Sequence, residues 1–477
     1  MKKIGCFVCN FNKRKYVVDC VKSLLQQVYD KSKNQIDIYV IDNASTDDSV
    51  EVLQREYKDQ IKLVVNAENL GGSGGFNTGL RIALEKNYDY AVLVDNDVKV
   101  APHAIQTMFD YMESHRDVGI LGTKILQMNK PNIVQDLGGT ITPNMQMEGN
   151  YFDRLDENLP EELESDYICT CTAMTRVEAM RKFGLMPEDN FIYWDDVEWS
   201  KKCQMAGYKT VAISSATVWH NLSMVDNRLS SFVRYYGTRN RFNYFLKYAD
   251  EDKLDECIDT ILTQMFYMFF GYHNKGFNEM IDVLSYAFDD VLHQVRGKAA
   301  PYKLKQIPKK NTPFEQLILK SDNIKIKFMD SFMPDTQFIY VVLNYIIQQM
   351  QKTKVHDRLG IDLSNCSYSA EEFLETYNHT AKNGEHDFKM PEVYITSTNE
   401  GFDLCLTMCE HVKLVEKNIL PEIYVDKFCN CITSDEDYIY FKSFDTNLKF
   451  FKSIYRPLAK QAAEKIRAKS DNFLLKE

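Results

Sequence analysis

Short runs of β-branched residues alternate with amphipathic stretches over the first 130 residues of the chain. These runs predict strands at residues 4–8, 36–41, 61–65 and 90–94. The stretch between the first two strands predicts a helix, because apolar side chains recur there at helical spacing at Tyr16, Val17, Cys20, Val21, Leu24 and Leu25. Asp47 can cap a second helix that runs towards Tyr57. Strands that alternate with helices predict an α/β sheet with parallel crossover connections.

The pattern changes twice further along the chain. Strands are predicted at 167–174 and 209–219, and helices at 176–183 and 196–205, which extend the first domain. Beyond residue 230 long periodic helices dominate, at 254–270, 280–295 and 339–350, before a mixed region from 388 to 445 and a basic helix at 454–469. We therefore predict a catalytic domain over 1–250 and a mostly helical C-terminal domain over 251–477.

Composition and charge exclude several classes of protein. Hydrophobic residues make up 44% and charged residues 26% of the 477, as expected for a folded globular protein. The formal net charge of -11 argues against nucleic acid as a partner. No apolar run reaches about 18 uncharged residues, so no transmembrane helix is predicted.

The cysteines favour a reducing compartment. Twelve cysteines in this length lack the density of a disulfide scaffold, and polar Asn10 and Asn12 interrupt any signal-peptide core, so a cytoplasmic location is expected. Three groupings raise the alternative of metal or redox chemistry, namely Cys6/Cys9, Cys169/Cys171 and Cys429/Cys431. None has the spacing of a zinc ribbon, so buried thiols are the preferred interpretation.

Polar residues follow four of the predicted strands. They are Asn10 and Asn12, Asp42 and Asn43, Asn66 and Asn69, and Asp95 and Asp97. Each alone is typical of a turn. Because ligands bind outside the carboxyl ends of the strands in open α/β sheets, we expect these side chains to line one crevice.

The segment Asp95-Asn96-Asp97 follows an apolar strand. In extended backbone, residues two apart face the same side, so both carboxylates can address one Mg²⁺ or Mn²⁺ while Asn96 points away. In a transfer reaction from a nucleotide sugar, an ion of this kind neutralises the negative charge of the diphosphate that leaves. A lone pattern of this kind is weak, but its place after a strand makes it informative.

A glycine-rich segment opens the next predicted helix. It runs from Asn69 to Gly79 and includes Gly71, Gly72, Gly74 and Asn77. Glycines permit close approach of a ligand to the backbone, and a helix N-terminus favours negative charge. The segment has neither the lysine of a P-loop nor the third glycine of a dinucleotide fingerprint. A flexible surface loop is the alternative.

A second acidic motif, Trp194-Asp195-Asp196-Val197-Glu198-Trp199, stands at a predicted helix start. A carboxylate there can act as the general base that a sugar hydroxyl needs, although a simple helix cap is the alternative. The strand that follows ends in Trp219-His220, and His220 can complete a metal site.

In this order and combination, the motifs resemble those of family 2 inverting glycosyltransferases, within them the bacterial galactofuranosyltransferase and rhamnosyltransferase group. The resemblance covers residues 3–245 and rests on Cys9–Asn12, Ile41–Asp47, the glycine segment, Val94–Asp97, the tryptophan-carboxylate motif and Trp219-His220. It implies a GT-A fold with a mixed, mainly parallel central sheet.

The resemblance also implies roles for particular residues. Asp95, Asp97 and His220 surround the cation and diphosphate, and Asp196 is the catalytic base. The nucleotide-sugar donor is held by Asn10, Asn12, Asp42, Asn69, Gly71, Gly72, Gly74, Asn77, Asp95 and Asn96. The acceptor pocket is shaped by Trp194, Asp195, Glu198 and Trp219, and Arg239 contacts phosphate or acceptor.

The donor sugar is open between two alternatives. The glycine segment and the paired Asp195-Asp196 favour UDP-galactofuranose over dTDP-rhamnose, whereas Asn96 departs from the third carboxylate usual in galactofuranosyltransferases. The family implies a lipid-linked glycan acceptor, and the basic tail from Lys449 to Lys469 is suited to peripheral contact with the inner face of the cytoplasmic membrane. The oligomeric state is left open.

Two other classes of protein compete with this interpretation. A nucleotidyltransferase can use a strand-end Asp-x-Asp and a glycine loop, but it does not need Asp196 or His220. An inactive glycan-binding protein would keep the fold, yet intact Asp95, Asp97 and Asp196 argue against it.

Overall fold

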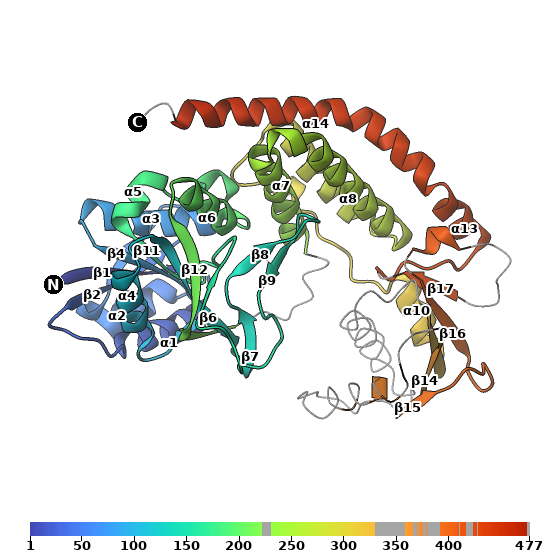
Figure 1. Ribbon diagram of the computed structural model, residues 1–477, viewed down its shortest axis with the longest axis horizontal. Coiled ribbons are helices and arrows are strands. Elements are labelled where there is room, and N and C mark those ends of the chain that lie inside the picture. Colours follow the sequence, from blue (N-terminus) through green and yellow to red (C-terminus); the bar gives the residue numbers. More distant parts are fainter. Residues whose placement is uncertain are drawn as a thin grey trace. The chain divides into compact units, whose positions relative to one another are not determined.

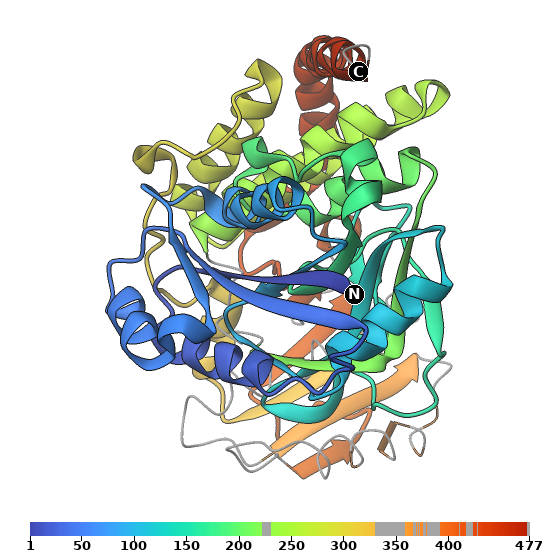
Figure 2. The ribbon, with the colours of Figure 1, turned by 90° about the vertical axis from the view of Figure 1, so that its left-hand side faces the viewer.

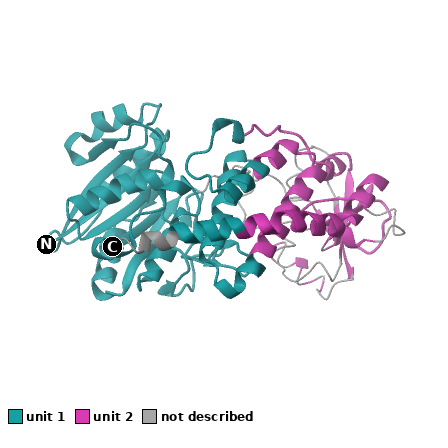
Figure 3. Ribbon diagram, turned by 90° about the horizontal axis from the view of Figure 1, so that it is seen from above, with its two compact units in different colours: residues 1–257, 285–304, 461–477 teal, residues 258–284, 305–460 magenta. Residues whose placement is uncertain are grey.

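The computed structural model describes residues 1–221, 230–329, 358–365, 369, 371, 373, 374, 378, 392–409, 411–415, 423–426 and 428–474. Two compact units are distinguished (Figure 3). The first comprises residues 1–257, 285–304 and 461–477, and the second comprises 258–284 and 305–460. The helix predicted at 339–350 lies outside the described residues.

A ten-stranded mixed sheet forms the centre of the first unit (Figures 1 and 2). Its main path has the order β10-β12-β6-β11-β4-β1-β2-β3, while β5 pairs with β12 and β7 with β6. The strands are β1 (Lys2–Asn10), β2 (Asn34–Asp42), β3 (Lys62–Val65), β4 (Tyr90–Asp95), β5 (Val98–Val100), β6 (Val118–Gln127), β7 (Lys130–Asp136), β10 (Glu162–Glu164), β11 (Thr172–Arg176) and β12 (Lys209–His220). A separate hairpin consists of β8 (Gly139–Ile141) and β9 (Met147–Gly149). The four strands predicted before residue 100 are confirmed as β1 to β4.

The register of the parallel strands gathers the predicted polar residues at one edge. Asn10 at the end of β1 is level with Asp42 at the end of β2, and the preceding Cys9 is level with Asp95 at the end of β4. His220 ends β12 and pairs with Val98 at the start of β5. Carboxyl ends of these strands therefore meet at the crevice that the sequence predicted.

Helices cover both faces of this sheet. One face packs against α1, α2 and α4 through residues such as Val21, Leu53 and Met108, and the other packs against α3, α5 and α6 through residues such as Leu80 and Trp199. The helices of the first part of the chain are α1 (Arg14–Leu25), α2 (Ser49–Tyr57), α3 (Gly71–Glu85), α4 (Ala104–Ser114), α5 (Val177–Phe183), α6 (Asp195–Met205) and α7 (Ser231–Tyr248). The N-cap of α2 is Asp48 and not the predicted Asp47, although Asp47 Oδ1 accepts a hydrogen bond from the Ser49 N–H at 3.1 Å.

The second unit contains a five-stranded parallel sheet in the order β15-β14-β13-β16-β17. Its strands are β13 (Asn323–Met329), β14 (Arg358–Asn365), β15 (Glu392–Ile395), β16 (Leu404–Cys409) and β17 (Ile423–Asp426). Ile324, Ile326 and Phe328 alternate onto one buried face, where Phe314 and Ile318 also lie. The sequence indicated only a mixed region from residue 388, and it did not predict β13 or β14.

The helices predicted after residue 250 are confirmed where the structure describes them. They are α8 (Leu254–Asn274), α9 (Asn278–His293) and α14 (Phe444–Leu474). The sequence did not predict α10 (Pro313–Leu319) or α13 (Asp435–Lys442). Single 3-10 turns are η1 (Lys58–Gln60), η2 (Glu188–Asn190), η4 (Glu251–Lys253), η5 (Pro301–Lys303) and η7 (Val412–Leu414). Among the described residues, no helix has the length and apolar character needed to cross a membrane.

Candidate active site

The turn between β4 and β5 carries Asp95, Asn96 and Asp97 to the edge of the sheet. Its backbone is held from two sides. The Asp95 N–H donates to the carbonyl of Cys171 at 2.9 Å, and the Asn221 N–H donates to the carbonyl of Asp97 at 3.1 Å. Cys171 precedes β11 and Asn221 follows β12, so two neighbouring strands fix the position of the turn.

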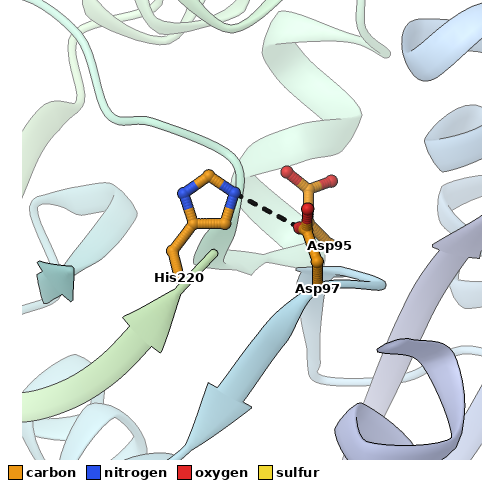
Figure 4. A group of neighbouring side chains, drawn as sticks. All are labelled: Asp95, Asp97 and His220. Atoms are coloured by element: carbon orange, nitrogen blue, oxygen red, sulfur yellow. Dashed lines mark ion pairs between the residues drawn. The ribbon is translucent and has the colours of Figure 1, made fainter. Parts of the chain in front are cut away.

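Asp95, Asp97 and His220 converge at this turn (Figure 4). One ligand atom from each lies within 4.8 Å of the others, and His220 Nε2 is 3.3 Å from Asp97 Oδ1. Two carboxylates and an imidazole form a donor set that suits Mn²⁺ or Mg²⁺. Within the described parts of the chain, this is the one group of three or more such residues so placed, and the cysteine groupings do not form another.

Burial and like charge perturb this group. Burial, together with the charge of Asp97, raises the pKa of Asp95 to about 7. Burial alone would lower the pKa of His220, but the hydrogen bond and charge of Asp97 outweigh it and raise that pKa. Two carboxylates held this close repel each other, and a divalent cation would relieve the repulsion.

The second acidic motif begins α6 after a strained backbone segment. Phe191, Tyr193 and Trp194 all have positive φ angles, of 67°, 63° and 64°. Non-glycine residues avoid this conformation, and it persists where the surrounding structure imposes it, as at active sites. The sharp turn presents Asp195 and Asp196 at the N-terminus of α6.

Asp196 has the electrostatic character of a general base. Burial, followed by the charge of Asp195, raises its pKa to about 7, and the charge of Asp95 contributes further. The Val197 N–H donates to its Oδ1 at 2.9 Å, which orients the carboxylate. A carboxylate with a pKa near neutrality is both ionised and basic enough to accept a proton from a hydroxyl. Asp196 is partly exposed, whereas Asp195 is 8% exposed.

A chain of side-chain hydrogen bonds links the Asp-Asn-Asp turn to β1 and β2. Asn96 Nδ2 donates to Asn10 Oδ1 at 3.0 Å, and Asn10 Nδ2 donates to Asp42 Oδ1 at 2.9 Å. The other Asp42 oxygen accepts the Ser45 N–H at 2.9 Å. Asn10 and Asp42 are fully buried. Asn96 therefore points away from Asp95 and Asp97, as the alternation predicted, and steadies the β1 side of the crevice.

Two further predicted residues shape loops at the same edge. Asn12 has φ 52° and its Oδ1 accepts the Thr46 N–H at 2.7 Å, which ties the end of β1 to the loop after β2. Asn69 Oδ1 accepts from Gly71 N–H at 2.9 Å and from Asn43 Nδ2 at 3.1 Å. Both side chains thus build the loops that surround the crevice.

Residues 6–184 match the profile of Glycosyl transferase family 2. The chain carries a family 2 glycosyltransferase domain. The predicted GT-A type of fold, with its mixed sheet and helical C-terminal region, agrees with this domain.

Named relatives of this glycosyltransferase include galactofuranosyltransferase GlfT2 of Mycobacterium tuberculosis, which is 25% identical over 191 residues. That match takes in 36% of this chain and spans 30% of the length of the relative. A crystal structure of Staphylococcus aureus TarS is 16% identical, with a TM-score of 0.38 and coverage of 61% of this chain and 53% of that one. A structure of GalNAc-T7 with UDP, GalNAc and Mn²⁺ is 15% identical, with a TM-score of 0.43 and coverage of 53% and 49%.

The glycine segment of the glycosyltransferase is explained by packing. A Cβ at Gly71 would lie 2.0 Å from the carbonyl oxygen of Phe191, and one at Gly75 would lie 2.4 Å from Cys9 Sγ. A Cβ at Gly74 would meet Leu70 at 2.6 Å. Gly72 faces Asp195, whose carboxylate is thereby placed near the positive end of α3. These contacts show that the flexible-loop alternative is wrong, because the segment is the tightly packed start of α3. Donor binding by Gly71, Gly72 and Gly74 stays a prediction.

Four predicted contacts of the glycosyltransferase with its substrates are corrected by burial. Asn77 is fully buried, and its amide bonds with the backbone of Met186 at 2.9 and 3.0 Å. The ring of Trp194 is 4% exposed and packs against Tyr244 and Phe245. Neither side chain is free to contact a donor or an acceptor.

The other two corrections concern charged side chains. Glu198 is 4% exposed and pairs with Lys247 at 2.7 Å, so it anchors α7 to α6 instead of shaping the acceptor pocket. Arg239 is fully buried, and its guanidinium donates to the carbonyls of Gly297 at 2.8 Å and Asn190 at 3.0 Å. Spacing along the sequence did not reveal these partners, because they lie about 50 residues away.

Two residues of this edge were missed by the sequence analysis. Asn43 was noted only as a strand-end residue, yet its amide holds the loop before α3 through Asn69 and the carbonyl of Gly71. Gln135 contacts the His220 ring and carried no signal in the sequence. Trp219 remains partly exposed beside His220, with its Nε1–H donating to the carbonyl of Pro131 at 3.3 Å.

Proposed function

We propose that this glycosyltransferase is metal-dependent and inverting, and that it transfers galactofuranose from UDP-galactofuranose to a hydroxyl of a lipid-linked glycan. The observation that carries the proposal is the convergence of Asp95, Asp97 and His220 within 4.8 Å, next to an Asp196 whose pKa is raised to about 7. The galactofuranosyltransferase named among the relatives, together with the paired Asp195-Asp196, supports the choice of donor.

The cation would be held by Asp95, Asp97 and His220. Their two carboxylates and one imidazole fit Mn²⁺ or Mg²⁺, and the GalNAc-T7 structure contains Mn²⁺. When bound, the ion supplies charge neutralisation for the departing diphosphate. Asn10, Asn12 and Asp42 would support the donor site indirectly, because their hydrogen bonds fix the ends of β1 and β2, and Asn69 would support the adjacent loop.

The reaction step assigned to this chain is proton removal by Asp196. The carboxylate accepts the proton of the acceptor hydroxyl, and that oxygen forms the new bond to the anomeric carbon from the face opposite the diphosphate. The bond between the anomeric carbon and the diphosphate oxygen breaks, and its electron pair leaves with UDP. Attack and departure on opposite faces invert the anomeric configuration.

Acceptor contacts are proposed for residues that remain near the surface of the crevice. Trp219 offers a partly exposed ring beside His220, whereas Asp195 is buried and would act on the acceptor only through the adjoining base, Asp196. Lys99 Nζ lies 5.8 Å from the centroid of the Trp219 ring, so this corner carries positive charge next to an aromatic face. Such a corner suits a sugar that carries or adjoins phosphate.

Membrane contact is proposed for the part of α14 that belongs to the second unit, up to Lys460. Phe450, Ile454 and Leu458 recur every four residues on one face of this helix, and their exposed fractions are 68%, 46% and 42%. Lys449 and Lys460, eleven residues apart, lie along one flank of this apolar stripe. An apolar face bordered by lysine favours the surface of an anionic membrane, here the inner face of the cytoplasmic membrane.

One assay tests the reaction class and the donor together. The full chain is incubated with a panel of UDP-, dTDP- and GDP-sugars, with Mn²⁺, Mg²⁺ or EDTA, and nucleoside diphosphate release is measured. We expect UDP release from UDP-galactofuranose that EDTA abolishes. Release of dTDP from dTDP-rhamnose would reassign the sugar, and incorporation of a sugar phosphate into a nucleotide sugar would reassign the class to nucleotidyltransferase.

A further inference from the structure

We propose that Gln135 is a positioning residue, which holds the His220 ring so that its Nε2 faces Asp97 and the expected cation. This inference rests on the proposed metal site. It adds a residue that lies outside every motif of the sequence.

The first observation is a β-bulge in β7. Ile125 of β6 pairs with Asp136, and the next residue, Leu126, pairs with Val134. Gln135 is therefore the extra residue between two paired neighbours. Val134 is fully buried and Asp136 is 7% exposed, so both sides of the bulge are anchored. A bulge redirects the side chain of its extra residue, and bulges are frequent beside active sites.

The second observation is where the Gln135 side chain ends. Its Nε2 and Oε1 lie 2.8 Å and 3.1 Å from His220 Nδ1. The opposite ring nitrogen, Nε2, is 3.3 Å from Asp97 Oδ1. The imidazole is thus held between an amide on one side and the metal-binding carboxylate on the other, and its ring plane is fixed.

The chemistry of a neutral imidazole explains why the amide matters. Such a ring carries one N–H and one lone pair, so His220 can offer Nε2 to a cation only when Nδ1 carries the hydrogen. Gln135 Oε1 can accept that hydrogen when a cation occupies Nε2, and Gln135 Nε2 can donate to Nδ1 when His220 Nε2–H instead faces Asp97, so the amide holds the ring in both states. Partners of this kind are general at metal-bound histidines, and their removal typically costs about 10- to 100-fold in metal affinity or activity.

A purely space-filling role for Gln135 makes different predictions. If Gln135 only filled space, its substitution would lower the stability of the protein without changing which nitrogen of the His220 ring carries the hydrogen. Gln135→Glu keeps an acceptor oxygen at the same reach, whereas Gln135→Leu and Gln135→Met remove it. A matched control is Gln127, which is level with His220 on β6 and is 3% exposed, but whose Nε2 donates to Asp153 at 3.3 Å.

The experiment measures Mn²⁺ binding to the full chain by electron paramagnetic resonance of free Mn²⁺. We expect Gln135→Leu and Gln135→Met to bind about 10- to 100-fold more weakly, with Gln135→Glu and Gln127→Leu within a few-fold of the unsubstituted protein. Equal affinity of Gln135→Leu and the unsubstituted protein would overturn the inference. Unchanged binding by Asp97→Ala would instead overturn the proposed metal site, so the two failures are distinguishable.

A second readout needs no metal. Nitrogen-15 spectra of histidine-labelled protein, with the His220 signal identified by its loss in His220→Asn, report which ring nitrogen carries the hydrogen. In the metal-free protein, at a pH where the ring is neutral, we expect hydrogen on Nε2, which faces the Asp97 carboxylate, and a mixture of tautomers in Gln135→Leu. Identical His220 signals in both proteins would refute the positioning role, even if Gln135→Leu is less stable.

Discussion

Asn96 donates a hydrogen bond to Asn10 at 3.0 Å, and so joins the Asp-Asn-Asp turn to the strand that carries the predicted donor contacts. The same Asn10 donates to Asp42 at 2.9 Å. An amide at position 96 can donate this bond, whereas an ionised carboxylate cannot. Galactofuranosyltransferases usually have a third carboxylate at this position. Its replacement by the amide of Asn96 is therefore what allows the hydrogen bond to Asn10.

We expect Asn96→Asp to weaken nucleotide binding. The substitution leaves the buried Asn10 Oδ1 without its donor and places negative charge beside it. A buried acceptor left unsatisfied costs about 1–3 kcal/mol of folding free energy; where UDP binding requires the turn in its present position, that cost appears as a roughly 5- to 150-fold loss of affinity. Calorimetric titration with UDP measures the effect, and Asn87→Asp, at an exposed asparagine just beyond the C-terminal end of α3, serves as the control. Tighter UDP binding by Asn96→Asp would contradict the role given to this amide.

Asp196→Asn is expected to keep donor binding and to lose transfer. The amide retains the size of the side chain but cannot accept the proton of the acceptor hydroxyl, and loss of a general base typically costs about 10²- to 10⁴-fold in rate. Sugar transfer and the Kd for UDP-sugar are measured on the same preparation. Near-normal transfer would show that another group is the base.

The pH profile of transfer should reflect the raised pKa of Asp196. Because burial and Asp195 raise this pKa to about 7, the base is largely protonated in acid and ionised in mild alkali. At saturating donor and metal, the rate should rise as the pH passes through about 7 and level off above it. A rate that is flat from about pH 5.5 to about pH 8.5 would exclude a base with this pKa.

The same group should make the stability of the metal-free protein depend on pH. The folded pKa of about 7 exceeds the ordinary value of 3.8, so the folded state binds the proton more tightly than the unfolded state. The resulting stability is complete below about pH 4 and is lost as the pH rises through 7. Thermal melting of Asp196→Asn should show less decline over that range than the unsubstituted protein. Parallel melting curves would contradict the raised pKa.

The apolar stripe of α14 should be needed for membrane binding. Replacement of both Phe450 and Ile454 by aspartate is expected to reduce co-sedimentation with phosphatidylglycerol vesicles by about tenfold or more, because it places charge in the face that would enter the lipid. Ile439→Asp changes an equally exposed apolar residue, 66% exposed on α13, and is the matched control. If Ile439→Asp reduced co-sedimentation with the vesicles equally, membrane binding would not depend specifically on the apolar stripe of α14. Self-association through these residues, seen by analytical ultracentrifugation, would assign the face to a second copy of the chain.

Local patterns predicted the first part of the chain well, for identifiable reasons. Strands β1, β2 and β4 are apolar runs that end in polar residues, and α1 shows a clear helical period. These signals depend only on neighbours in the sequence. The five-stranded sheet of the second unit was not predicted, because the pairing of its strands depends on partners that lie tens of residues apart.

By itself, the sequence determined the type of sheet, its polar edge and the residues from which the site is built. Side-chain alternation places Asp95 and Asp97 on the same side of the chain, and strand ends that meet at one edge add His220. The three residues are therefore candidates for binding one ion. Only the tertiary structure decided which charged residues remain available to bind a substrate. Arg239 and Glu198 have the chemistry of binding residues, yet burial commits them to backbone carbonyls and to Lys247. Gln135 became part of the site only through a bulge in β7, because the pairing between strands, which no local pattern encodes, aims its side chain at His220.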